Sequence, residues 1–191
     1  DARARVFLEL GEVYHNHLAR VDLAEQAYNE ARLLIPDSSE ALHALGQLYE
    51  RSGNWFQALE MLEHEAELVA EPQLSAQLFE RIGRINEEML LNTSGAVEAY
   101  QKAIGKFPGS LAALEALKTM AREDEDWGGY ARYLEMILDA VTEPDDRFEL
   151  LVEMAQHKEA IEHDDLKAID LYEEAAEIDS SELECILELA E

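Results

Sequence analysis

Apolar residues recur along the chain at the spacing of amphipathic helices. Leu42, Leu45 and Leu48 fall on one helical face, and Leu59 and Leu62 form a second face further along. No segment alternates strictly between apolar and polar residues, which is the pattern of a half-buried strand. We therefore predict an all-α chain without a β-sheet.

The two-helix pattern repeats with a period of 36 residues. All four prolines keep this spacing, at Pro36, Pro72, Pro108 and Pro144. Proline lacks a backbone N–H and restricts the residue before it, so each one indicates a boundary between structural units. We divide the chain into repeats 1–36, 37–72, 73–108, 109–144 and 145–180, followed by a partial sixth repeat at 181–191.

Odd-numbered and even-numbered repeats differ. A shift of 72 residues superimposes Tyr28, Tyr100 and Tyr172 of the odd repeats, and Trp55 and Trp127 of the even ones. We expect extra length in the turn of odd repeats and in the second helix of even repeats. We expect the tryptophans to be packing anchors, with exposed partner contacts as the alternative.

Small residues occupy one position of the first helix, at Gly11, Gly46 and Gly83. We expect two helices to approach closely there, with Tyr28 and Tyr100 filling the space opposite. The expected helix caps are Ser38 or Ser39, Asn54, Ser94, Asp126 and Asp165.

The pattern resembles the tetratricopeptide repeat. The first repeat carries it in Leu10, Gly11, Tyr14, Ala24, Tyr28, Ala31 and Pro36. The resemblance covers nearly the whole chain and is weakest at 109–144, where Lys118 replaces the glycine and Tyr130 the alanine. A 36-residue period also suits the related Sel1-like repeats, but their glycine-rich turn is missing. The resemblance implies one right-handed α-solenoid of helix-turn-helix repeats over 1–191.

The charge of the chain favours some partners over others. Asp and Glu number 43 and Lys and Arg 15, giving a net charge of −28. Such a chain is ill suited to bind nucleic acid through phosphates or to bind anionic membrane surfaces. No apolar run approaches the ~18 residues of a membrane span. We expect a soluble protein, with the cytoplasm as the favoured compartment, and a charge that serves either solubility alone or the selection of basic partners.

In tetratricopeptide proteins the first helix of each repeat lines the concave face, so the resemblance implies a set of partner-binding residues. These are Arg5, Leu8, Glu12, His15, Asn16, Glu40, His43, Gln47, Glu50, Arg51, Gln77, Glu80, Arg84, Glu87, Glu88, Glu115, Thr119, Arg122, Glu123, Glu149, Val152, Gln156 and Glu159. Ten are glutamates and four are arginines. Members that grip the terminal carboxylate of chaperones use lysine and asparagine there, so we expect this face to repel a carboxylate. It suits a basic or amphipathic segment, with Leu8 and Val152 as small apolar contacts.

The four arginines of that set are expected to pair with neighbours such as Glu50 and Glu123, with acids of the partner as the alternative. We expect a non-enzymatic interaction scaffold that belongs to a larger complex and binds a basic peptide or helix. The alternatives are a structural spacer or assembly element, and a regulatory array attached to an enzyme. Because the chain starts at Asp1 and stops within a helical pattern, we expect it to be a segment of a longer protein.

Candidate chemistry along the chain is weak, and we expect no metal ion and no cofactor. The six histidines lack metal-binding spacing. His163-Asp164-Asp165 coincides with a turn and cap, and the calcium-loop match at Asp124–Glu135 lacks an oxygen ligand at Gly128. Cys185 is expected to be a packed, inert thiol.

Overall fold

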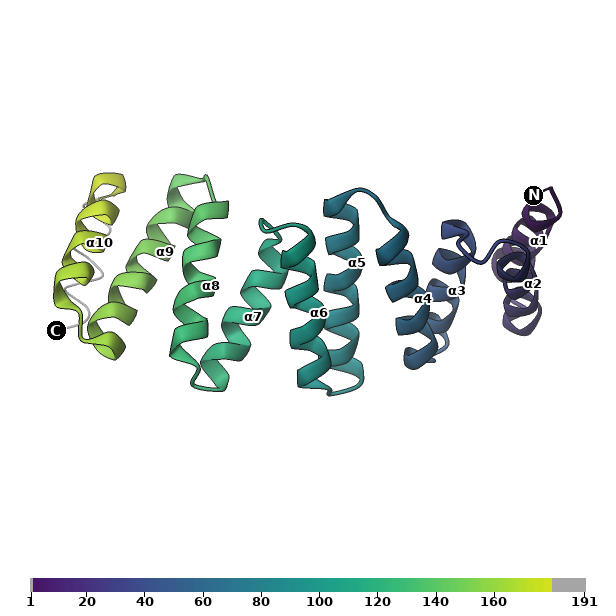
Figure 1. Cartoon of the computed structure of the whole chain (residues 1–191), viewed down its shortest axis with the longest axis horizontal. Coiled ribbons are helices and arrows are strands. Elements are labelled where there is room, and N and C mark those ends of the chain that lie inside the picture. The colour runs from purple at the N-terminus through teal and green to yellow at the C-terminus, as the bar shows by residue number, and fades with distance from the viewer. Residues whose placement is uncertain (1, 180–191) are drawn as a thin grey trace. The chain divides into compact units, whose positions relative to one another are not determined.

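The computed structural model describes residues 2–179, and every regular element within that range is helical (Figure 1). The all-α prediction is therefore confirmed. The chain forms two compact units, residues 1–110 and 111–191, which we call the N-terminal and the C-terminal unit. The predicted partial sixth repeat, with Cys185, lies outside the described residues.

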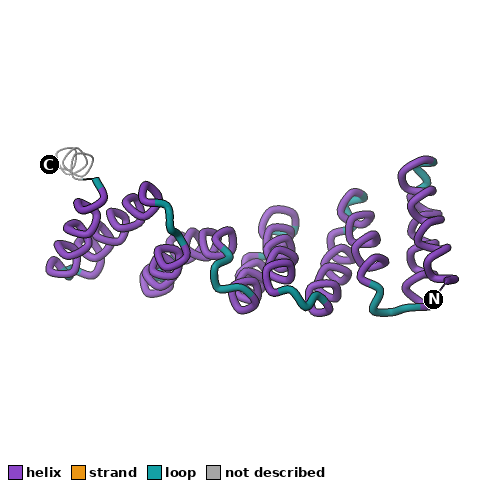
Figure 2. The backbone as a smooth tube through the Cα atoms, turned by 90° about the horizontal axis from the view of Figure 1, so that it is seen from above, coloured by secondary structure: helices purple, strands orange, loops and turns teal. Residues whose placement is uncertain are grey.

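The N-terminal unit is built from helix pairs joined by short loops (Figure 2). Its elements are α1 (Ala2–Glu12), the π-helical turn η1 (Val13–His17), α2 (Val21–Leu34), α3 (Ser39–Arg51), α4 (Trp55–Leu68), α5 (Pro72–Arg84), η2 (Ile85–Met89) and α6 (Thr93–Lys106). Consecutive helices pack against each other, so each pair buries part of its apolar surface. One core cluster consists of Ala24, Tyr28, Leu42, Leu45, Leu48, Tyr49, Ala58 and Met61.

The C-terminal unit continues the same helical pattern. Its described elements are α7 (Leu111–Glu123), α8 (Trp127–Ala140), α9 (Pro144–His157), η3 (Lys158–Glu162) and α10 (Asp165–Ile178). Phe148, Leu151, Val152 and Ala175 form a core cluster between α9 and α10. Single-domain organisation over 1–191 remains a prediction.

The alternation of the repeats is visible at the end of the first helix. In odd repeats this helix ends in a π-helical turn, as where the N–H of Leu90 donates to the carbonyl of Ile85 at 3.1 Å. A π turn takes in one residue more than an α turn, which accounts for the extra length predicted in odd repeats. The predicted lengthening of even second helices is wrong, because α2, α4, α6, α8 and α10 all span 14 residues.

The prolines occupy two kinds of position. Pro72 and Pro144 are the first residues of α5 and α9, where the missing N–H would have had no helical acceptor. Pro36 and Pro108 lie in the loops before α3 and α7. The constant spacing therefore marks loops after odd repeats and helix starts after even repeats.

Two of the predicted caps are confirmed. Ser38 accepts a hydrogen bond from the N–H of Ala41, and Asp126 accepts one from the N–H of Gly129. Asn54 precedes α4 without a side-chain cap bond.

The caps of α6 and α10 lie earlier than predicted. Asn92 caps α6 instead of Ser94, and Asp164 caps α10 instead of Asp165. In both turns a left-handed residue directly before the cap reverses the chain, so the next helix begins sooner.

The predicted close approach of helices occurs at two of the three glycines. A Cβ on Gly83 would lie 2.5 Å from Cε1 of Tyr100, and one on Gly11 would collide with Tyr28 in the same way. Around Gly46 the nearest side-chain atom is 3.7 Å away, so that glycine is not required.

The fifth repeat shows the alternative to the glycine and tyrosine pair. Ala155 occupies the glycine position and is fully buried, while Tyr172 opposite it is only half-buried. The ring of Tyr100, by contrast, is 5% exposed over Gly83. A methyl group at the glycine position thus goes with a less buried tyrosine.

A histidine is buried in the C-terminal unit. The side chain of His157 is 4% exposed and lies against the rings of Tyr130 and Trp127, with centroid distances of 4.9 and 6.0 Å. Its Nε2 lies 3.5 Å from a carboxylate oxygen of Glu162 but makes no hydrogen bond in the described structure. Burial lowers the pKa of His157 below its ordinary value of 6.5, against the opposing field of Glu162.

We expect Gly83→Ala to lower the free energy of unfolding by about 1–3 kcal/mol, because the new methyl group must displace the Tyr100 ring. Gly46→Ala is the matched control and should leave stability unchanged or raise it by up to about 1 kcal/mol through helix propensity. Urea unfolding of both variants measures the difference. Equal effects would contradict the close approach at Gly83.

We expect His157→Ile to reduce the acid sensitivity of the chain. Because the folded-state pKa of His157 is depressed, the unfolded chain binds the extra proton first, and stability is lost as pH falls below 6.5 towards the folded pKa. Isoleucine occupies the equivalent place at Ile85, where it is 6% exposed. Urea midpoints at about pH 8 and about pH 5 should differ less in the variant than in the parent chain. Parallel pH profiles would show that His157 does not carry this proton linkage.

Candidate functional site

A cleft of about 710 Å³ lies between α1 and α3, and we call it the acidic cleft. It is lined by Ala2, Ala4, Arg5, Leu8, Glu9, Glu12, Tyr28, Ile35, Ser38, Glu40 and Ala44. Four residues predicted from the resemblance meet here: Arg5, Leu8, Glu12 and Glu40. The helical spacing of the first three places them along one side of α1.

Two carboxylates of the acidic cleft have no positive partner. The only guanidinium group among the lining residues belongs to Arg5, and its Nε donates to a carboxylate oxygen of Glu9 at 3.2 Å. Glu12 and Glu40 are exposed and make no ion pair within residues 2–179. Leu8, Ile35 and Ala44 supply apolar walls beside them. The cleft therefore combines free negative charge with apolar surface.

A second, smaller pocket of about 310 Å³ is lined by three arginines, and we call it the arginine pocket. Glu50, Arg51, Trp55, Arg81, Arg84, Ile85, Glu88 and Met89 line it. Glu50 was expected to pair with one of the four arginines of the predicted set, but Arg81, which lies outside that set, donates to it at 2.6 Å. Arg51 instead contacts Nε2 of His15 at 2.6 Å, and Arg84 has no carboxylate partner among the described residues.

The arginine pocket changes the expected charge of the site. The face was expected to repel carboxylates throughout, whereas three guanidinium groups and two carboxylates meet at this pocket. Half-buried Trp55 lines the pocket rather than serving only as a packing anchor, whereas Trp127 packs edge-on against Tyr130 at 6.1 Å. Sequence reasoning missed Arg81 because it lies outside the positions carried over from the resemblance.

A hydrogen-bonded chain joins α3 to α4. Gln47 lies 2.8 Å from His43 Nε2, and His43 Nδ1 lies 3.1 Å from a carboxylate oxygen of Glu65. A neutral imidazole that donates from Nδ1 and accepts at Nε2 satisfies both contacts. Burial raises the pKa of Glu65, and the neighbouring His43 opposes this shift. Glu65 was not predicted because it belongs to a second helix.

Several predicted binding residues have internal partners instead. Ser110 donates to Glu80 at 2.6 Å, Tyr100 to Glu87 at 2.9 Å, and Tyr172 to Glu159 at 3.4 Å. Burial, followed by the bond to Glu87, raises the pKa of Tyr100. Glu115 pairs with Lys118 at 3.0 Å. These carboxylates are less available to a partner than Glu12 and Glu40.

One predicted contact is wrong. Val152 is 6% exposed and packs with Phe148 and Leu151, so it cannot offer apolar surface to a partner. The remaining predicted residues are exposed on η1, α5, α7 and α9: Asn16, Gln77, Thr119, Arg122, Glu123, Glu149 and Gln156. Glu123, expected to pair with an arginine, has no ion pair in the described part of the chain, and neither does Arg122.

The weak metal candidates have structural roles. Asp164 caps α10, and α8 begins at Trp127, inside the segment that matched a calcium loop. Within residues 2–179 no group of His, Cys, Asp and Glu side chains is placed to hold a metal ion. None of the helices described in this range is both long and apolar enough to cross a bilayer.

Comparison with known proteins bears on the fold. Residues 78–110 match the family model described as Tetratricopeptide repeat. The chain has the tetratricopeptide-repeat fold. No curated protein sequence matches it.

Solved tetratricopeptide structures agree with the chain over most of its length. MamA is 18% identical with a TM-score of 0.56, covering 95% of this chain and 94% of MamA. YrrB, described as a TPR protein with an unusual peptide-binding site, is 14% identical with a TM-score of 0.53, covering 91% of this chain and 85% of YrrB. PilF of Pseudomonas aeruginosa is 13% identical with a TM-score of 0.54, covering 94% of this chain and 78% of PilF. At these identities the likeness concerns the fold.

Proposed function

We propose that the chain is a non-enzymatic interaction scaffold that holds a basic segment of a partner protein in the acidic cleft, as part of a larger complex. The observation that carries the proposal is the pair of carboxylates, Glu12 and Glu40, left without a cation beside apolar walls. The tetratricopeptide fold supports it, since such arrays present extended surfaces for partners. The peptide-binding site described for YrrB is a further reason to consider a peptide.

The chemistry of the cleft suits a lysine or arginine side chain. The alkyl stem of such a side chain would lie against Leu8, Ile35 and Ala44. Its charged end would be attracted by the carboxylates of Glu12 and Glu40. Charge-assisted hydrogen bonds to carboxylates are stronger than neutral ones, so two such acceptors favour a cation over an uncharged side chain. The net charge of −28 attracts a basic segment from a distance. The proposal assigns no catalytic role, cofactor or metal ion to the chain.

We expect Glu12→Gln with Glu40→Gln to weaken binding of a labelled peptide with one central lysine between leucines by about tenfold or more. Replacing that lysine by norleucine should weaken binding to the parent chain equally. Rising ionic strength should weaken binding of the lysine peptide, because salt screens partly exposed charges. Fluorescence anisotropy measures all three effects.

The matched control is Glu123→Gln with Glu177→Gln, which removes the same charge from exposed positions elsewhere. This control should change affinity little. Equal weakening by both pairs would show that only the general field attracts the peptide. Unaltered binding in the cleft variant would contradict the acidic cleft and favour a spacer role.

A further inference from the structure

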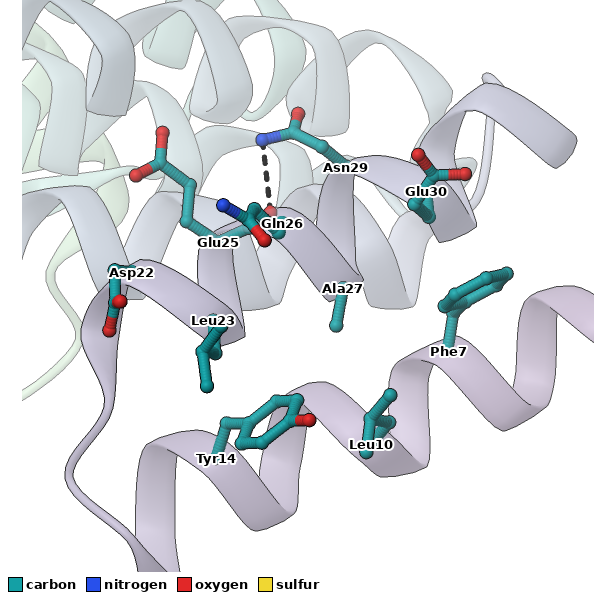
Figure 3. A pocket seen from close by; sticks show the side chains of 10 residues that line it. All are labelled: Phe7, Leu10, Tyr14, Asp22, Leu23, Glu25, Gln26, Ala27, Asn29 and Glu30. Atoms are coloured by element: carbon teal, nitrogen blue, oxygen red, sulfur yellow. Dashed lines mark hydrogen bonds between the residues drawn. The ribbon is translucent and has the colours of Figure 1, made fainter.

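The groove in Figure 3 and the arginine pocket differ in what surrounds them. The groove lies between α1 and α2, and Phe7, Leu10 and Tyr14 line one of its sides. On α5 the counterpart of Leu10 is Ile82, which is 2% exposed because α4 packs there. Exposure of that groove is therefore no evidence for a partner. The arginine pocket is built from α3, α4, α5 and η2, and each of these packs against described helices before and after it.

The repeat scaffold does not require the three arginines of this pocket. Their counterparts, 72 residues away, are acids or an amide: Glu9 and Glu153 for Arg81, Glu12 and Gln156 for Arg84, and Glu123 for Arg51. The tryptophan of the pocket, by contrast, keeps its counterpart in Trp127. A chain with 15 basic and 43 acidic residues thus gathers three arginines at one pocket, where other repeats form the same helices without them.

Two of the three guanidinium groups are open to a partner. Arg81 is half-buried and donates to Glu50 at 2.6 Å, which holds it in the wall of the pocket. Arg51 and Arg84 are exposed, and neither makes an ion pair within residues 2–179. The contact of Arg51 with Nε2 of His15 does not neutralise its charge, because an imidazole nitrogen that accepts a hydrogen bond is unprotonated.

Charge and apolar surface together indicate the occupant. Three arginines against two glutamates, Glu50 and Glu88, leave the lining with one net positive charge. Met89 is 48% exposed and Trp55 is half-buried, so apolar surface adjoins the guanidinium groups. Guanidinium groups hold a carboxylate through paired hydrogen bonds, and burying methylene groups on an apolar surface is favourable. A glutamate side chain offers both features.

The field of the whole chain restricts which segment can deliver this glutamate. A net charge of −28 repels a segment that is acidic overall, so the glutamate must belong to a segment that also carries positive charge. The segment proposed for the acidic cleft has this property. Helix α3 joins the two sites, since Glu40 and Ala44 line the cleft and Glu50 and Arg51 line the pocket.

The geometry of α3 sets the distance between the two sites. From Glu40 to Arg51 the helix makes about three full turns, so both side chains project from nearly the same face, about 16 Å apart along the axis. An extended segment covers this distance in about five residues. Because alternate residues of an extended segment share a face, side chains about four or six residues apart meet the two sites.

We propose that the arginine pocket binds a glutamate side chain of the same partner segment whose cation occupies the acidic cleft. The carboxylate faces Arg51 and Arg84, and the methylene groups lie against Met89. The glutamate stands about four or six residues from the cation in the partner sequence. This spacing rests on the proposed function of the cleft, whereas the carboxylate site rests on the pocket alone.

The probe is the labelled lysine peptide with both termini blocked and one glutamate added about two, four or six residues from the lysine, on either side. We expect glutamate at the two longer spacings, on at least one side, to increase affinity about fivefold or more over the matched glutamine peptide. At the shortest spacing it should give no gain, because it stays beside the carboxylates of the acidic cleft. Fluorescence anisotropy measures these affinities.

Charge changes in the chain locate the carboxylate. Arg51→Gln with Arg84→Gln should remove the gain. The matched control, Arg122→Gln with Lys167→Gln, removes the same charge from exposed positions of the C-terminal unit and should keep the gain. Arg84→Glu should reverse the preference, so that a lysine in place of the added glutamate binds more tightly. This variant is expected to fold, because glutamate occupies the equivalent place at Glu12.

Trp55 reports on the pocket directly. In a chain that carries Trp127→Phe it is the single tryptophan, and the glutamate peptide should shift its fluorescence because Trp55 lines the pocket. The same shift should appear, at higher peptide concentration, when Glu12→Gln and Glu40→Gln are added. Failure of the acidic cleft alone therefore leaves this signal intact.

Three outcomes decide the proposal. Equal affinity of the glutamate and glutamine peptides at every spacing would overturn it, as would a gain that survives Arg51→Gln with Arg84→Gln. A gain that requires a free C-terminal carboxylate would assign the pocket to the end of a partner chain and overturn a glutamate side chain. A glutamate effect that persists without any dependence on the lysine would support the carboxylate site and overturn the cleft together with the spacing.

Discussion

A pair of helices cannot cover its own apolar surface, and the structure of each compact unit depends on this constraint. Within the N-terminal unit, the surface of α5 is buried because α4 lies on it, as shown by Ile82 at 2% exposure. The equivalent surface of α1 carries Leu10 at 37% exposure. The residues are similar in both places, so their burial is set by the neighbouring helix. Stability in such an array is a sum of contacts between neighbouring repeats.

Close packing within each pair imposes a second condition. Gly11 and Gly83 allow an aromatic ring to lie directly on the first helix, whereas Ala155 goes with a half-buried Tyr172. The hydroxyl groups of Tyr100 and Tyr172 donate hydrogen bonds to Glu87 of η2 and Glu159 of η3. Part of the acidic composition thus satisfies buried or half-buried tyrosines and is not free for partners.

The remaining charge is distributed unevenly. The acidic cleft holds Glu12 and Glu40 without cations, and the arginine pocket holds Arg51 and Arg84 without carboxylate partners in the described structure. A net charge of −28 therefore describes the long-range field, while recognition at short range depends on which charges are left unpaired.

The sequence by itself determined the helical class, the repeat period and the alternation of odd and even repeats, because helix periodicity, proline and glycine act through local backbone geometry. It also identified Gly83 and Tyr100 as partners. It placed the caps of α6 and α10 too late, treated Gly46 as necessary, and took Val152 for a surface contact. Only the tertiary structure decided that Arg81, outside the predicted set, takes Glu50, and that α4 covers Ile82 of α5. Ion pairs and burial depend on which helices lie side by side, and residues 31 positions apart in the sequence, such as Glu50 and Arg81, meet only through packing.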